Sequence, residues 1–216
     1  MSRQGIPFVV SAPSGTGKTT VCRALVERDP QIEFSVSHTT RTPRRGEVDG
    51  VHYHFVTPDE FEELVRADGF VEHAVYAGNR YGTSWSAIDG PLEAGRDLLI
   101  EVEVQGAEQL RARRKDAKFV FMLPPSMNEL ERRLRGRGTD SADAIKRRLD
   151  AVRSELAAVH HFDYAVVNDD VDRAIEALGE IVAAERAGEP ERARQAWGRA
   201  TVVAELADLL PLTPQS

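Results

Sequence analysis

The sequence predicts an α/β fold in which helices cover both faces of a parallel β-sheet. The first observation is that apolar runs of strand length recur at residues 8–10, 97–102, 118–123 and 164–167. The second is that stretches with helical periodicity alternate with these runs across short loops, as in sheets built from crossover connections. The third is that the first run leads through a glycine-rich turn directly into a helix. Together these features predict one core, which a chain of 216 residues can bury.

The glycine-rich turn matches a phosphate-binding pattern. Residues 12–19 fit G-x-x-x-x-G-K-[ST] at every fixed position but the first, where Ala12 replaces glycine. In this pattern backbone N–H groups and the positive end of the next helix face phosphate oxygens, Lys18 adds positive charge, and the Thr19 hydroxyl can ligate Mg²⁺. A turn that merely contains small residues is the structural alternative. We expect a nucleoside-triphosphate site at Ala12, Pro13, Ser14, Gly15, Thr16, Gly17, Lys18, Thr19 and Thr20.

A change of composition marks an insertion after the first helix, which covers residues 19–29 and ends before Pro30. From Phe34 to about Gly90 the chain is richer in Gly, Pro, His and Tyr and carries short alternating runs such as residues 51–56, which predicts a small, largely β insertion. Within it, a capping box at residues 57–60 opens a helix to about residue 67, and residues 70–76 form a strand that ends in a turn at 78–79.

The parallel core resumes after the insertion. The apolar run at 97–102 is of the kind that is buried on both faces. Ser126 and Glu129 form a second capping box, and the helix that they open stops near Gly136. The other core elements are a helix over about 105–114, a strand over 118–123, a helix from 141 to about 159, a strand over 164–167 and a helix from 171 to about 186.

Residues 187–216 differ in kind from the core. Gly188 and Pro190 break the preceding helix, and residues 191–210 are helical again with an apolar stripe. We expect this stripe to dock on the rest of the chain, with a subunit contact as the alternative. The stripe consists of Trp197, Val203, Leu206 and Leu210.

Composition and charge argue against several classes of protein. The net charge of −7 disfavours general nucleic-acid binding, which usually needs a basic surplus. The single cysteine, Cys22, excludes an intramolecular disulfide. No apolar run approaches the roughly 18 residues that cross a bilayer, and residues 1–5 carry no signal-peptide core. We therefore expect a cytoplasmic protein with neither nucleic acid nor membrane as a partner, and the sequence leaves its oligomeric state open.

Two groups of residues in the insertion suggest ligand contacts. Arg41 and Arg44 lie three residues apart in a proline-braced loop, which suits a bidentate grip on one phosphate, although a solvated basic loop is the alternative. Tyr53 and Tyr81 can add hydroxyl donors. Glu72 lies in an otherwise apolar strand, where it either faces solvent or accepts two parallel hydrogen bonds from a base that has an imino N–H beside an amino group.

Several runs of the sequence together resemble one family, the guanylate kinases. They are the phosphate loop, residues 35–44, 46–50, 53–56 and 81–83, and the run Val167-Asn168-Asp169-Asp170. The similarity extends to about Arg186. It implies an enzyme that transfers the γ-phosphate of ATP to GMP and gives ADP and GDP, with Mg²⁺ as cofactor. It also implies a P-loop core over 1–33 and 91–186 with a helical lid at about 130–150, a GMP-binding insertion over 34–90, and a helical extension over 187–216 that lies outside the resemblance.

The resemblance further implies roles for single residues. The GMP phosphate would be held by Arg41, Arg44, Tyr53 and Tyr81, and the guanine base by Ser37, Glu72 and Thr83. The run Glu101-Val102-Glu103-Val104-Gln105-Gly106 stands where the family usually has Asp-x-Asp-x-Gln-Gly, so Glu101 would lie near the metal and Glu103 near the guanine amino group. Arg133, Arg137 and Arg148 would act with Lys18 on the transferred phosphoryl group. Asn168 would contact the adenine or ribose of ATP, unless it is an ordinary helix cap.

Two other functions remain as alternatives. Guanylate kinase-like modules of scaffolding proteins keep the fold and bind phosphopeptides without catalysis, and they have no need of the phosphate loop together with the lid arginines. A related kinase that phosphorylates a ribose bisphosphate would have no use for Ser37, Glu72 and Thr83.

Overall fold

The computed structural model describes residues 3–76, 78–136 and 142–206, except for the side chains of residues 142–144, 147, 148 and 153. The chain forms two compact units. The first unit contains Met1–Val9 and Pro30–Ala117, and the second contains Val10–Asp29 and Lys118–Ser216. The chain passes from one unit to the other inside the first strand, β1.

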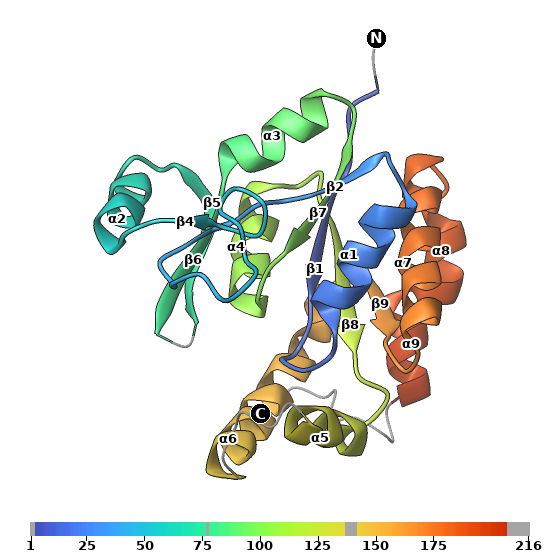
Figure 1. Cartoon of the computed structure of the whole chain (residues 1–216). Coiled ribbons are helices and arrows are strands. Elements are labelled where there is room, and N and C mark those ends of the chain that lie inside the picture. Colours follow the sequence, from blue (N-terminus) through green and yellow to red (C-terminus); the bar gives the residue numbers. More distant parts are fainter. Residues whose placement is uncertain (1–2, 77, 137–141, 207–216) are drawn as a thin grey trace. The chain divides into compact units, whose positions relative to one another are not determined.

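The main sheet has five strands in the order β2-β7-β1-β8-β9. β2 and β7 pair in parallel with Ile32 opposite Asp97, and β8 and β9 pair in parallel with Val120 opposite Tyr164. Helices flank this sheet (Figure 1), which confirms the predicted α/β fold. Its strands are β1 (Pro7–Ser11), β2 (Ile32–Phe34), β7 (Asp97–Glu101), β8 (Lys118–Leu123) and β9 (Tyr164–Val167).

The first unit also contains a four-stranded mixed sheet with the order β4-β3-β6-β5. β3 pairs in parallel with β4, whereas the β3–β6 and β5–β6 pairs are antiparallel, in agreement with the predicted, largely β insertion. Of the alternating run at 51–56 only His54 and Phe55 form a strand, because the N–H groups of Val51 and His52 bond to Val48 in a local turn. The strands are β3 (His38–Thr39), β4 (His54–Phe55), β5 (Phe70–Tyr76) and β6 (Asn79–Ser84).

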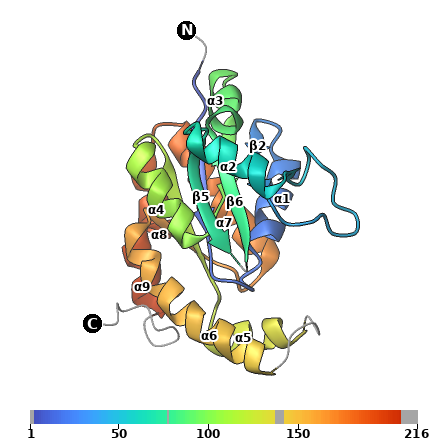
Figure 2. The ribbon, with the colours of Figure 1, turned by 90° about the vertical axis from the view of Figure 1, so that its left-hand side faces the viewer.

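Three helices belong to the first unit. In α2 (Pro58–Arg66) both halves of the capping box between Thr57 and Glu60 are present, as predicted. The sequence analysis missed α3 (Trp85–Glu93), because Gly90 and Pro91 are poor helix formers, yet Ser84 caps its first turn. The third helix, α4 (Val104–Arg113), lies beside β5 (Figure 2). The core of this unit is apolar and buried, and includes Phe61, Phe70, Ile88, Leu92, Leu99, Ile100 and Leu110.

In the second unit β8 pairs with β9, and helices pack against β9. α1 (Lys18–Arg28) lies beside α7 (Val171–Arg186) (Figure 1), and α5 (Met127–Gly136) contacts α6 (Ala142–Ala157), which continues into the 3₁₀ helix η1 (Ala158–His161). Only half of the second capping box forms, because the Glu129 N–H bonds to Ser126 Oγ while its carboxylate accepts from two arginines instead. The buried core includes Val21, Cys22, Phe119, Phe121, Leu178 and Ile181.

As far as residue 206, where the described part of the chain ends, the C-terminal segment forms two helices in place of the single helix expected over 191–210. α8 (Pro190–Trp197) and α9 (Arg199–Leu206) are separated by Gly198, whose extended backbone (φ −59°, ψ 136°) forms an antiparallel bridge with Tyr164. A Cβ at Gly198 would lie 2.3 Å from the carbonyl oxygen of Arg194, so this close approach requires glycine. α8 packs on α7 and β9, and α9 packs on β9, where Leu206 is buried. Leu210 lies outside the described residues.

None of the helices in the described parts of the chain is both long and apolar enough to cross a bilayer.

Candidate active site

The phosphate loop connects β1 to α1 and takes its shape from two glycines. Gly15 and Gly17 adopt positive φ angles of 94° and 93°, which glycine tolerates without a steric cost. Ala12 is not in this region, since Asp68 is the one described non-glycine residue with positive φ. An alanine can therefore stand at the first position of the pattern. Lys18 and Thr19 are the first two residues of α1, so they lie at the helix end whose dipole favours anions.

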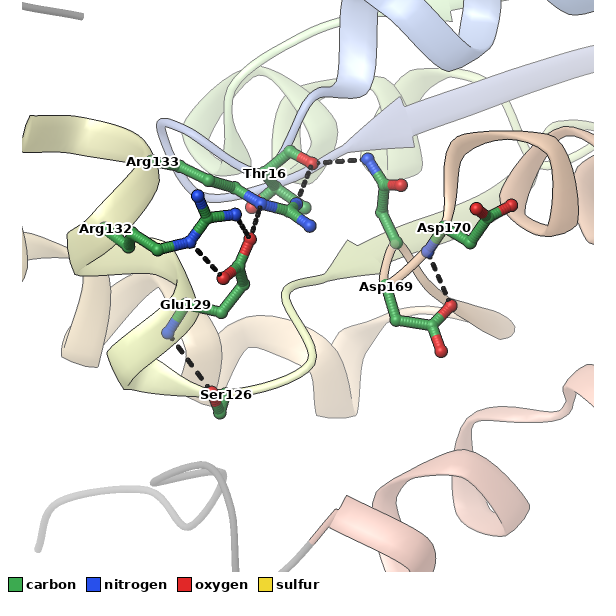
Figure 3. A network of polar contacts seen from close by, with 8 residues as sticks. Thr16, Ser126, Glu129, Arg132, Arg133, Asp169 and Asp170 are labelled. Atoms are coloured by element: carbon green, nitrogen blue, oxygen red, sulfur yellow. Dashed lines mark hydrogen bonds and ion pairs between the residues drawn. The ribbon is translucent and has the colours of Figure 1, made fainter. Parts of the chain in front are cut away.

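Two side chains support the loop through one carbonyl group. The Thr16 oxygen accepts hydrogen bonds from Asn168 Nδ2 at 2.6 Å and from Arg133 Nη1 at 3.4 Å. Figure 3 shows Arg133 reaching Thr16 from α5. Asn168 follows β9 and is 2% exposed, and a Cβ at Gly17 would lie 2.6 Å from its amide nitrogen. Asn168 thus holds the loop backbone at the Thr16 carbonyl group, and the Thr16 N–H bonds within the loop to the Pro13 carbonyl oxygen at 3.2 Å.

Asn168 is not the cap of the following helix. The α7 cap is Asp170, whose carboxylate accepts a hydrogen bond from the Arg173 N–H at 3.1 Å. The helix-cap interpretation of Asn168 is therefore wrong. The loop carbonyl that it binds lies 152 positions earlier in the sequence, so no local pattern could have indicated the contact.

Of the three arginines predicted to act on the phosphoryl group, only Arg133 has a described side chain. Arg133 Nε bonds to Glu129 Oε1 at 2.8 Å, and the same carboxylate accepts from Arg132 (Figure 3). The guanidinium groups of Arg132 and Arg133 lower the pKa of Glu129 to about 2, so this carboxylate is ionised at neutral pH. Arg137 and the side chain of Arg148 lie outside the described residues, although the backbone of Arg148 belongs to α6.

A second arrangement of residues that were predicted to bind an anion lies in the insertion, around Arg41. Its guanidinium lies 5.4 Å from the centre of the Tyr53 ring, and the rings of Tyr53 and Tyr81 meet edge to face at 5.9 Å. Burial, followed by the charge of Glu101 and by Tyr81, raises the pKa of Tyr53 to about 12. Tyr53 therefore keeps its proton and can act as a hydroxyl donor throughout the physiological range. Arg44, the other predicted phosphate contact, has an exposed side chain.

Glu47 is the residue that sequence reasoning missed in this arrangement. Its carboxylate accepts from Arg41 Nη2 at 2.8 Å and Nη1 at 2.9 Å, and from the Arg44 N–H at 2.6 Å. The Arg41 side chain is only 12% exposed. A signal for Glu47 was present, because an acidic residue in a loop with two arginines is a natural ion-pair partner.

Three polar side chains form a hydrogen-bonded chain across the mixed sheet. The Thr83 hydroxyl donates to Glu72 Oε1 at 2.6 Å, and it lies 3.1 Å from the Ser37 hydroxyl. Since Thr83 gives its one proton to Glu72, it accepts from Ser37. Glu72 is 4% exposed and Thr83 is fully buried, so the alternative of a solvent-facing Glu72 is wrong. A buried carboxylate oriented by a hydroxyl group suits a ligand with adjacent N–H groups.

The two acidic residues at the end of β7 and just after it, Glu101 and Glu103, occupy different local settings. Glu101 is the last residue of β7, and its charge acts on Tyr53. Glu103 is the N-cap of α4, with an extended backbone and no side-chain cap hydrogen bond. In the described residues no group of three or more His, Cys, Asp or Glu side chains could hold a metal ion. A Mg²⁺ bound mainly by phosphate oxygens needs few protein ligands, and the exposed Thr19 hydroxyl fits that kind of coordination.

Comparison with known proteins decides the family. A family model described as guanylate kinase matches residues 4–185. The chain belongs to the guanylate kinase family. The guanylate kinase of Syntrophotalea carbinolica is 50% identical over 185 residues, which cover 86% of this chain and 88% of that protein. The guanylate kinase of Paramagnetospirillum magneticum is 50% identical over 187 residues, covering 86% of this chain and 87% of that protein.

A solved structure agrees with the sequence relatives. The crystal structure of guanylate kinase from Anaplasma phagocytophilum matches with a TM-score of 0.71 at 32% identity, and the match covers 85% of this chain and 87% of that one. The predicted resemblance and the P-loop α/β fold are thus confirmed. As a member of the guanylate kinase family the chain is a nucleotide-binding kinase, a phosphotransferase. The family match ends at residue 185, so α8 and α9 lie outside it.

Proposed function

We propose that this chain transfers the γ-phosphate of ATP to GMP and releases ADP and GDP. The observation that carries the proposal is the buried chain from Ser37 through Thr83 to Glu72 in a member of the guanylate kinase family. Guanine carries an imino N–H beside an amino group, and the carboxylate of Glu72 can accept from both. Ser37 and Thr83 are proposed to turn their hydroxyl protons from this chain to the guanine carbonyl oxygen when GMP binds, and Glu103 is the proposed partner of the amino group.

The ATP phosphates are proposed to bind the phosphate loop of the second unit. The residues are Ala12, Pro13, Ser14, Gly15, Thr16, Gly17, Lys18, Thr19 and Thr20. Asn168 is included because its side chain donates to the Thr16 carbonyl oxygen of this loop. The Thr19 hydroxyl would hold the Mg²⁺ of the nucleotide, and Glu101 is the other proposed contact of this ion, through a water. When bound, Mg²⁺ supplies neutralisation of the phosphate charge.

Transfer to the GMP phosphate requires that this phosphate is positioned and that its negative charge is stabilised. It requires no general base. The second pKa of this phosphate is about 6, so the attacking oxygen is ionised near neutral pH. Arg41, Arg44, Tyr53 and Tyr81 are proposed to hold this phosphate. Phosphoryl transfer depends on positioning and on charge stabilisation, and one arginine on the transferred group can contribute about 10³-fold in rate or more. In this proposal Lys18, Arg133, Arg137 and Arg148 stabilise the charge of the transferred phosphoryl group. The enzyme is proposed to be cytoplasmic.

The two alternatives lack support in the described geometry. A phosphopeptide-binding module has no need for a loop with positive φ at both Gly15 and Gly17 followed by Lys18 at a helix start. A kinase for a ribose bisphosphate has no base to recognise. Burial of the Glu72 carboxylate would then cost desolvation free energy that no contact with a ligand offsets.

The test is an ADP-release assay, coupled to NADH oxidation, with ATP, Mg²⁺ and a panel of acceptors. The panel contains AMP, GMP, CMP, UMP and ribose phosphates, each at the same concentration. We expect release of ADP with GMP at a kcat/KM at least about 10²-fold above that with AMP. Adenine has an acceptor nitrogen where guanine has its imino N–H, and an amino group where guanine has its carbonyl oxygen, so its pairing edge leaves the carboxylate without that donor. Equal rates with AMP and GMP, or a preference for ribose phosphates, would contradict the proposal.

A further inference from the structure

Helix α4 is fastened to the outer edge of β5 by one face. Gln109 Nε2 donates to the His73 carbonyl oxygen at 2.8 Å, and the His73 N–H donates to Gln109 Oε1 at 3.1 Å. One turn further along, Arg113 Nη1 donates to the Phe70 carbonyl oxygen at 2.8 Å. These bonds flank Glu72 on the strand, and Figure 2 shows α4 running beside β5. The helix is therefore held at a fixed distance from the strand.

Gly106 lies on this same face, since it precedes Gln109 by three residues and Arg113 by seven. It is the third residue of α4, is buried, and is not among the described glycines with positive φ. Its backbone therefore does not require glycine, and within a helix alanine is the better residue. Some other requirement must account for a glycine at this position.

That requirement is space for the carboxylate of Glu72. A Cβ at position 106 would lie 2.5 Å from Glu72 Oε2 and 3.2 Å from Glu72 Cδ. It would also lie 3.2 Å from Val102 Cβ, a contact that a small adjustment relieves. Because three hydrogen bonds hold α4 against β5, the carboxylate is the part that can move. Its other oxygen, Oε1, accepts from Thr83 at 2.6 Å, so any movement disturbs the chain of hydroxyl groups as well.

We propose that Gly106 is a positioning residue, which sets the carboxylate of Glu72 and thereby the affinity for the guanine base. The proposal rests on the proposed function of Glu72. Gly106 contacts no substrate in this account. Because Gly106 has no side chain, it leaves room for the Glu72 carboxylate beside the N-terminal turn of α4. The dipole of the helix also favours a carboxylate at this end.

The test compares Gly106→Ala with a matched control. Gly179→Ala in α7 is the control, because its Cβ would meet only Leu25 Cδ1 at an ordinary distance of 3.4 Å. Calorimetry measures the Kd for GMP, the coupled assay measures the KM for ATP, and circular dichroism measures the Tm. We expect Gly106→Ala to weaken GMP binding about tenfold or more, the effect of one displaced hydrogen-bonding carboxylate, and to change the KM for ATP less than about twofold. Both variants should keep or slightly raise the Tm.

Rescue by a shorter carboxylate separates positioning from a general disturbance. Glu72→Asp withdraws the carboxylate by one methylene and alone should weaken GMP binding. Combined with Gly106→Ala, it should restore binding relative to Gly106→Ala alone, because the added methyl group fills the space that the shorter side chain leaves. An unchanged Kd in Gly106→Ala, a loss of its folded state, or additive losses in the double variant would each overturn the proposal.

The readouts keep this proposal apart from the proposed function. If the unmodified chain binds GMP without turnover, the kinase assignment fails, whereas the effect of Gly106→Ala on the Kd still tests the positioning role. If the unmodified chain turns GMP over and Gly106→Ala binds GMP equally well, the positioning role fails and the kinase assignment stands.

Discussion

Glu47 holds Arg41 with both of its carboxylate oxygens, at 2.8 and 2.9 Å from Nη2 and Nη1. The oxygen that accepts from Nη1 also accepts from the backbone N–H of Arg44 at 2.6 Å. One carboxylate thus fixes the side chain of one proposed phosphate-binding arginine and the backbone of the other. The guanidinium also donates from Nη1 to the Thr42 carbonyl oxygen at 2.8 Å, so the side chain of Arg41 is held within its own loop. The pair therefore prepares the loop for an anion before the anion arrives.

We expect Glu47→Gln to raise the KM for GMP about three- to tenfold, because a neutral amide makes a weaker and less directional contact with the guanidinium. Steady-state kinetics with GMP varied at saturating ATP provides the measurement. The KM for ATP serves as the internal control and should not change. A lower KM for GMP would mean that Glu47 competes with the phosphate for Arg41, which is the opposite role.

The same pair predicts a pH dependence of stability. The hydrogen bonds from Arg41, followed by that from the Arg44 backbone, lower the pKa of Glu47 from 4.5 to about 2. A carboxylate whose pKa is depressed in the folded state stabilises fully above its unfolded pKa, and this contribution is lost as the pH falls through the folded pKa. The difference in unfolding free energy between the unmodified chain and Glu47→Gln should be constant above pH 4.5 and should shrink progressively as the pH falls towards 2. Urea titrations from pH 3 to 7 measure it, and a difference that grows on acidification would contradict the ion pair.

Glu72→Gln should weaken GMP binding far more than ATP binding. The amide oxygen of Gln can still accept a hydrogen bond from Thr83. The amide cannot accept hydrogen bonds from both N–H groups of guanine, because its own NH₂ group would face one of these donors. We expect a rise in the KM for GMP of about 30-fold or more, equivalent to about 2 kcal/mol, with little change for ATP. Equal effects on both substrates would remove Glu72 from the base site.

Asn168→Asp tests the support of the phosphate loop. The substitution replaces a donor with a carboxylate that faces the Thr16 carbonyl oxygen, which now lies 2.6 Å from the amide nitrogen. Repulsion there should displace the loop, so we expect kcat/KM for ATP to fall at least about tenfold while the Kd for GMP stays the same. Normal kinetics with ATP would show that this contact has no part in holding the loop.

Lys18→Ala should lower kcat by two or more orders of magnitude, as expected when a charge on the transferred phosphoryl group is lost (roughly 10²- to 10³-fold). The fold should remain, because Lys18, although buried, is the charged first residue of α1, and the apolar buried face of this helix consists of Val21, Cys22 and Leu25. Single-turnover rates and the Tm of the variant provide the check. Near-normal turnover would refute the assignment of the phosphate loop.

The sequence predicted best where a strong period and local chemistry agree. The strands at 118–123 and 164–167 and the helix at 171–186 have the predicted bounds, because their apolar patterns are unambiguous. The single C-terminal helix was wrong, since a long-range bridge between Gly198 and Tyr164 breaks it. Local patterns cannot reveal such a partner.

For the site residues, too, local sequence indicated the chemistry of single side chains but not their long-range partners. The residue types at Arg41, Tyr53, Glu72 and Thr83 indicated anion and base binding. The sequence did not reveal that Thr83 donates to Glu72 or that Asn168 binds the loop, because each contact depends on how separate segments meet. The contact of Glu47 with Arg41 is local, and its signal in the sequence was missed. Donor and acceptor roles are set by three-dimensional packing.

The central claim is phosphoryl transfer from ATP to GMP, and ³¹P NMR of one reaction mixture tests it most directly. The mixture contains the full chain, ATP, Mg²⁺ and equal amounts of GMP and AMP. The account predicts that ADP and GDP appear in equal amounts, with GMP consumed, AMP unchanged and no matching rise in inorganic phosphate. Inorganic phosphate formed in step with ADP, or phosphorylation of AMP in place of GMP, would contradict it.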